Sequence, residues 1–90
     1  MGLDTQHEII QECNTIAEML CDKNRKYGDS ALNPVRVFSK CSAIEQINVR
    51  IDDKLSRLRS AQDDDAEDAE MDLIGYLILK RIAKRRQSVV

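Results

Sequence analysis

The 90-residue chain is poor in proline, glycine and aromatic side chains. One Pro and three Gly leave few positions for tight turns, which disfavours all-β sandwiches and barrels. The aromatic residues are Tyr27, Phe38 and Tyr76, too few for a surface on which single-stranded nucleic acid stacks. No apolar run approaches the roughly 18 residues that a membrane-spanning helix needs, and no signal-peptide pattern follows Met1. We therefore expect a cytoplasmic protein with neither a membrane nor a nucleic-acid partner.

Cysteine and histidine are also scarce. Cys13, Cys21 and Cys41 are odd in number, and none forms a Cys-x-x-Cys pair. With His7 as the single histidine, neither a zinc site nor a disulfide framework is expected. His7 has no serine nucleophile nearby and is interpreted as a surface residue. The thiols are interpreted as small, buried or half-buried reduced side chains in a reducing cytosol.

What the chain does have is segregated charge. The net charge is only −2, and the 42% hydrophobic content suits one folded domain over residues 1–90. Residues 1–22 contain five acids and no Lys or Arg, whereas residues 23–59 contain nine bases and four acids. Residues 63–72 contain seven acids, and residues 80–86 contain five bases. A small net charge therefore conceals strong local fields.

Two helices are predicted over residues 5–26 and 43–60, where apolar side chains recur at helical spacing. Thr5 with Glu8 and Ser42 with Glu45 each form the Ser/Thr-x-x-Glu capping box that opens a helix. Gly28 is expected to end the first helix.

A third helix is predicted over residues 66–86, with Asp64 or Asp65 as its N-cap. Asn33 and Pro34 suit the opening of a short helix that runs through Phe38. The predicted fold is therefore all-α, a small unit of three to four helices.

Apolar side chains cover nearly the whole circumference of the third predicted helix between residues 71 and 79. A helix that is apolar on all sides is buried on all sides, and two partner helices cannot achieve that well. We therefore expect a second copy of the chain to cover part of it, so that homo-oligomerisation completes the fold. Gly75 lowers helix propensity and is expected to admit a close neighbour.

Groups that suit a phosphorylated ligand gather at the end of the first helix, in the loop that follows it and on one face of the second helix. The candidates are Lys23, Asn24, Lys26, Tyr27, Gly28, Asp29, Ser30, Asn33, Arg50 and Lys54. Cations neutralise phosphate, a tyrosine ring packs on a base or ribose, and hydroxyl, amide and carboxylate groups read polar edges. The cations at the helix end equally suit the helix dipole, and Asn24 suits either the core or the ligand.

The acidic segment offers a second chemistry. Asp68 and Asp72 lie four residues apart on one face of the third helix, where paired carboxylates can hold Mg²⁺. The alternative is that Asp72, which has apolar neighbours, forms a salt bridge with a base from the first or second helix.

Four motifs in the sequence resemble those of a known protein family. They are Lys23-Asn24-x-x-Tyr27-Gly28-Asp29-Ser30, Asn33-Pro34-x-Arg36-x-Phe38-Ser39-Lys40, Arg50-x-Asp52-Asp53-Lys54-x-x-Arg57-Leu58 and Asp72-Leu73-x-x-Tyr76. Over about residues 10–85 the chain resembles the small all-α nucleotide modification associated domain family of phages and prophages. The resemblance implies association with nucleotides, and it adds Arg36 and Lys40 to the candidate ligand-binding residues.

A more distant similarity is to the all-α NTP pyrophosphatases of the MazG and dimeric dUTPase type, which hold Mg²⁺ between a Glu-x-x-Glu helix and a Glu-x-x-Asp helix. Glu67-x-x-Glu70 and the Asp68–Asp72 pair approximate only the second element. The second predicted helix presents bases where the first element would face it. This departure favours binding phosphates over cleaving them.

Three functions are consistent with these residues. The first is a phage-type anti-defence protein that sequesters a phosphorylated nucleotide, for example a cyclic or ADP-ribose-like immune messenger, without cleaving it. The second is an Mg²⁺-dependent nucleotide pyrophosphohydrolase, or an accessory protein of nucleotide metabolism and DNA modification. The third is a protein-binding inhibitor or assembly factor whose acidic run mimics nucleic acid.

Overall fold

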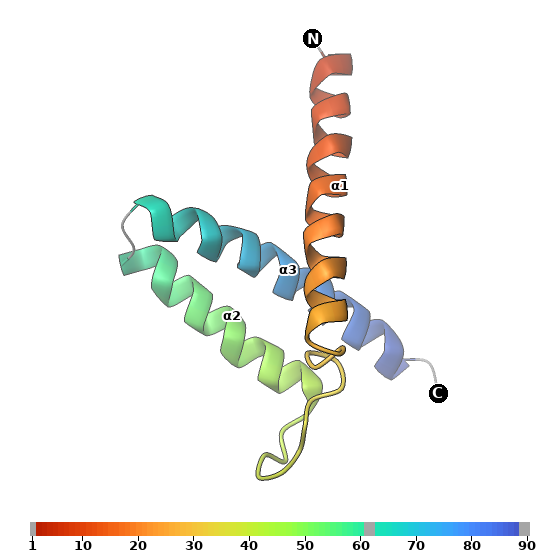
Figure 1. The fold of residues 1–90 in the computed structure, drawn as a ribbon, viewed down its shortest axis with the longest axis vertical. Coiled ribbons are helices and arrows are strands. Elements are labelled where there is room, and N and C mark those ends of the chain that lie inside the picture. Colours follow the sequence, from red (N-terminus) through yellow and green to blue (C-terminus); the bar gives the residue numbers. More distant parts are fainter. Residues whose placement is uncertain (1, 61–62, 89–90) are drawn as a thin grey trace.

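A computed structural model describes residues 2–60 and 63–88, and the side chains of residues 4–60 and 68–87. Within these residues the chain folds as three α-helices without strands: α1 (Gly2–Lys26), α2 (Ala43–Ser60) and α3 (Asp63–Ser88) (Figure 1). The predicted all-α class is therefore confirmed. None of these described helices combines the length and the apolar character that crossing a lipid bilayer requires.

The second helix begins and ends where the sequence predicts. The Ser42 hydroxyl accepts a hydrogen bond from the Glu45 backbone N–H at 3.1 Å, so Ser42 caps the first turn of α2. The Glu45 side chain accepts a hydrogen bond from the amide of Asn48 at 3.1 Å, one turn along the helix. The serine half of the predicted capping box is thus confirmed.

The starts of the other two helices differ from the prediction. α1 begins at Gly2, so Thr5 lies inside the helix and cannot cap it. α3 begins at Asp63, which places Asp64 and Asp65 within its first turn. In both cases helix-compatible residues continue upstream of the expected cap, and nothing in the sequence stops the helix there.

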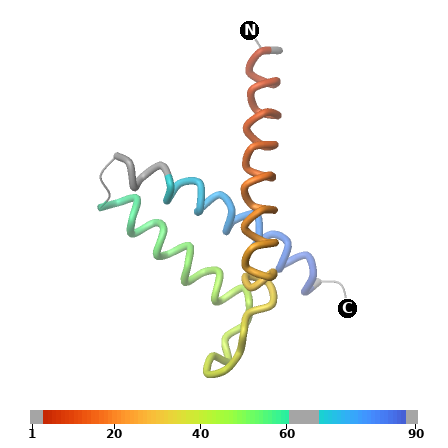
Figure 2. Tube along the Cα trace, in the orientation of Figure 1, coloured from red at the N-terminus to blue at the C-terminus, as the bar shows by residue number. Residues whose placement is uncertain are grey.

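The predicted short helix from Asn33 to Phe38 is wrong. Residues 27–42 form turns and irregular chain between α1 and α2 (Figure 2). Pro34 fixes its own backbone but gains no helical turn after it, and Val35, Val37 and Phe38 are exposed. Without a packing surface, so short a helix has too few hydrogen bonds to offset its nucleation cost.

α2 and α3 lie side by side as an antiparallel pair, and α1 crosses α3 with its N-terminal half projecting away from that pair (Figure 1). Ile47 of α2 packs with Leu79 and Ala83 of α3 at the centre of the core. Leu20 of α1 packs against the same cluster. A Cβ placed on Gly75 would lie 3.2 Å from Leu20 Cδ1, so the predicted close neighbour of Gly75 is α1.

Candidate functional site

The site is built on the turn that ends α1. Gly28 and Asp29 both adopt left-handed backbone conformations, with φ of 64° and 61°. The Asp29 N–H donates to the Asn24 carbonyl at 3.0 Å, the six-to-one hydrogen bond of a Schellman turn. Gly28 ends the helix as predicted because it adopts positive φ at no steric cost. Asp29 tolerates the same region better than most residues.

Asp29 also organises the turn through its side chain. One carboxylate oxygen accepts from the Asn24 amide at 2.8 Å, and the other accepts from the Asn33 amide at 2.6 Å. Two residues predicted to read a ligand, Asp29 and Asn33, thus bond to each other. Ala31 and Leu32, the next residues in the loop, pack against the core. These contacts fix Ser30 beside the end of α1.

A cleft of about 610 Å³ opens between the end of α1, the following loop, α2 and α3. Five of the predicted ligand-binding residues line it, together with Asp72: Lys23, Asn24, Tyr27, Ser30 and Arg50. Its apolar wall includes Leu20, Ile47 and Leu79, which belong to or pack on the core. The sequence motifs from three separate segments therefore meet at one cavity.

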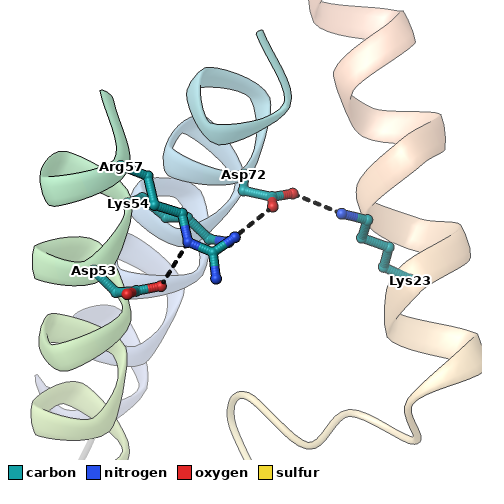
Figure 3. Close-up of polar contacts among 5 residues, drawn as sticks. All are labelled: Lys23, Asp53, Lys54, Arg57 and Asp72. Carbon is teal, nitrogen blue, oxygen red and sulfur yellow. Dashed lines mark hydrogen bonds and ion pairs between the residues drawn. The ribbon is translucent and has the colours of Figure 1, made fainter. Parts of the chain in front are cut away.

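Asp72 of α3 is held by a lysine on each side (Figure 3). Lys23 Nζ lies 2.6 Å from Asp72 Oδ1, and Lys54 Nζ lies 3.1 Å from Asp72 Oδ2. The side chains are 49% exposed for Lys23, 13% for Lys54 and 26% for Asp72. We name these three residues the lysine clamp. The salt-bridge alternative for Asp72 is thus the arrangement observed, with a base from each of the other two helices.

The contact between Lys23 and Asp72 shifts the pKa of both groups. Burial by itself raises the pKa of Asp72, but the hydrogen bonds from Lys23 and Lys54 outweigh it and leave the pKa below its ordinary value. The hydrogen bond to Asp72 raises the pKa of Lys23 against a smaller opposing effect of burial. Both shifts stabilise the charged forms, so the Asp72 carboxylate and the Lys23 ammonium group are ionised at neutral pH.

Eight predicted site residues lie outside the lining of the cleft: Lys26, Gly28, Asp29, Asn33, Arg36, Lys40, Lys54 and Asp68. The Lys26 ammonium stands 5.7 Å from the centre of the Tyr27 ring, a cation–π distance. The Arg36 guanidinium donates to the Cys41 carbonyl within the loop. Lys40 is exposed on the loop, and Asp68 is exposed on α3.

Arg50 differs from the two lysines of the clamp. It lines the cleft from α2, and it has no ion-pair or hydrogen-bond partner in the described part of the chain. Sequence reasoning missed Gln46, which lines the cleft one turn earlier and donates to the Cys41 carbonyl at 3.1 Å. The spacing of Gln46 and Arg50, four residues apart, was the signal that could have revealed it.

Among the described side chains, no group of three or more His, Cys, Asp or Glu is arranged to hold a metal ion. Comparison of the chain with protein-family models, with curated proteins and with solved structures found no match.

Proposed function

We propose that the cleft binds a phosphorylated nucleotide and sequesters it without cleaving it. The observation that carries this proposal is the meeting of Lys23 and Arg50, from two different helices, in one cavity beside Tyr27. The volume of about 610 Å³ lies within the range of small-molecule sites, roughly 300–1,000 Å³.

The lining supplies the kinds of contact that a nucleotide needs. The Arg50 guanidinium can donate two parallel hydrogen bonds to one phosphate group. Tyr27 is 60% exposed, and we expect its ring to stack on a base or ribose. The Asn24 amide and the Ser30 hydroxyl line the same cavity and can pair with polar edges of the base or sugar. A nucleotide immune messenger is the ligand class that we put first.

The state of Asp72 favours binding over metal-assisted hydrolysis. Each of its two oxygens faces a lysine ammonium group, at 2.6 Å and 3.1 Å. A divalent cation would have to displace those lysines before this carboxylate could coordinate it. Asp68, the second carboxylate of the predicted Mg²⁺ pair, is exposed one helical turn away from Asp72.

We also infer that the protein is a homo-oligomer, with the second copy on α1 and not on the third helix, where the apolar pattern of the sequence placed it. Ile9 and Ile10 on the projecting half of α1 are 56% and 59% exposed. Ile9 lies on the same stripe as Ile16 and Leu20, which pack within the chain. The bases of residues 23–40 lie at the other end of α1 from the acidic residues of that half. Two antiparallel copies would bring opposite charges together and cover the stripe.

The proposal is tested with the purified protein. Small molecules that co-purify with it are identified by mass spectrometry, and nucleotides are then titrated by isothermal calorimetry. Arg50→Met should weaken binding by about 10- to 100-fold, because a charge-assisted hydrogen bond to phosphate is lost. Arg59→Met, on the same helix but outside the cleft, is the matched control and should bind as the parent does.

Cleavage is examined in the same experiment. The protein is loaded with nucleotide in the presence of Mg²⁺, denatured by heat, and the released ligand is analysed. Intact ligand supports sequestration. Turnover that Asp72→Ala abolishes would establish the hydrolase instead, and equal affinity in Arg50→Met and the parent would remove the cleft as the binding site.

A further inference from the structure

The two lysines of the clamp come from different helices and end on one carboxylate. Lys23 and Asp72 line the cleft, whereas Lys54 contacts Asp72 from outside the lining. Lys23 comes from the last turn of α1, and Lys54 from the middle of α2 (Figure 3). Their ammonium groups contact opposite oxygens of Asp72. Without that carboxylate, two positive charges would face each other, and Lys54, only 13% exposed, would have little water to screen it.

The Asp72 carboxylate therefore occupies the place, between two lysines, that an anionic group of a ligand could occupy. A phosphate oxygen pair offers the lysines the same kind of hydrogen bond as a carboxylate does. Asp72 itself lines the cleft together with Lys23 and Arg50. A phosphate that reaches Arg50 in this cavity therefore meets the carboxylate, whose negative charge repels it.

We propose that Asp72 is an internal competitor for the ligand's phosphate, which must take over Lys23 and Lys54 from the Asp72 carboxylate to bind fully. The inference rests on the proposed function and adds a specificity-determining residue to it. In the unliganded protein Asp72 keeps the two lysines in place and prevents their mutual repulsion. In the liganded protein the phosphate replaces it at both ammonium groups.

Competition of this kind sets a charge requirement on the ligand. Lys23, Arg50 and Lys54 carry three positive charges, and Asp72 cancels one of them. A ligand with one negative charge exchanges one anion for another at the lysines and gains little. A ligand with two or more, such as a nucleotide with two phosphate groups, also engages Arg50 and outcompetes the carboxylate. The cleft is thereby selective against singly charged metabolites.

The affinity of Asp72→Asn for inorganic pyrophosphate, measured by isothermal titration calorimetry, tests the inference. Asparagine keeps the shape of the side chain and removes its charge. Because the binding-competent arrangement is then no longer a minor population, we expect about tenfold tighter binding than in the parent. Asp53→Asn makes the same chemical change at an exposed aspartate that pairs with Arg57 at 3.4 Å, and should change affinity by less than about twofold.

The outcomes separate this inference from the function on which it rests. Parent protein that binds pyrophosphate, with Asp72→Asn equal or weaker, overturns the competitor role alone. Absence of binding in both proteins, or binding that Arg50→Met leaves unchanged, overturns the proposed function and this inference together. Circular dichroism of Asp72→Asn establishes that its helices are intact before the titration.

A measurement on the unsubstituted protein keeps the inference testable if Asp72→Asn fails to fold. The Asp72 carboxyl carbon is followed by NMR across a pH titration, with and without saturating pyrophosphate. Displacement removes two lysine hydrogen bonds from the carboxylate, so its titration midpoint should rise when pyrophosphate is bound. An unchanged midpoint would show that the lysines stay on Asp72, and the competitor role would be wrong.

Discussion

At the scale of single residues, Asp72 links folding stability to pH. Its native pKa lies below the ordinary value, so the native state binds fewer protons than the unfolded state as the pH falls. The stability from the lysine clamp is present above the unfolded carboxyl pKa, near about 4, and is lost as the pH falls through the lower native pKa.

Asp72→Asn should accordingly lower the free energy of unfolding by about 1–2 kcal/mol at neutral pH. The estimate stays modest because Lys23 is half exposed. At about pH 3 and below, the difference from the parent should shrink as the parent carboxyl becomes neutral. Urea unfolding followed by circular dichroism at both pH values measures it. A difference that does not change with pH would show that the cost arises from packing and not from charge.

The same scale shows why some side chains could be placed from the sequence and others could not. Lys23, Tyr27 and Ser30 were predicted as ligand-binding residues, and all three line one cleft. The role of Asn24 stayed open because its position on the apolar stripe conflicts with its polarity. In the structure the Asn24 amide donates a hydrogen bond to the Asp29 carboxylate. That contact depends on the positive φ of Asp29, a non-glycine residue, and no sequence pattern indicates this backbone conformation.

At the scale of elements, the structure predicts different stability costs for removing the first residue of each expected capping box. Ser42→Ala should lower the free energy of unfolding by about 1 kcal/mol, because it removes the acceptor for the Glu45 backbone N–H. Thr5→Ala should cost much less, since Thr5 lies inside α1, where alanine is the better helix former. Chemical unfolding of both variants measures the contrast. Equal costs for the two substitutions would mean that α1 begins at Thr5 after all.

Helix boundaries were predictable where a capping hydrogen bond forms and unpredictable where it does not. α2 lies between Ser42 and the end of its periodic pattern, and both limits were predicted. α1 extends upstream of Thr5 because the preceding residues tolerate helix. The short helix predicted in the loop before α2 is wrong for a different reason. The Asn33 amide donates a hydrogen bond to Asp29 instead of opening a helix. Local signals compete there with a turn that only the tertiary structure reveals.

At the scale of the whole molecule, the projecting half of α1 is the feature that one copy of the chain leaves without packing partners. Its charges are all acidic between residues 4 and 22, and its exposed large apolar side chains include Ile9 and Ile10. An amphipathic helix gains most of its stability from tertiary packing, so an unsupported half-helix of this length is marginal by itself. The second copy that we propose would bury the stripe, supply the missing packing and stabilise the helix that carries Lys23.

Ile9→Glu should therefore shift the protein toward the 10.3 kDa monomer in size-exclusion chromatography with light scattering. A buried glutamate at the interface loses its hydration and adds negative charge to an already acidic segment. Val49→Glu introduces the same charge at a residue of α2 that is 65% exposed and should leave the mass unchanged. A parent protein that is already monomeric, or an equal effect of the two substitutions, would contradict assembly through α1.

Because Lys23 lies on the same helix, loss of the oligomer in Ile9→Glu should also weaken pyrophosphate binding. Val49→Glu should leave that binding unchanged.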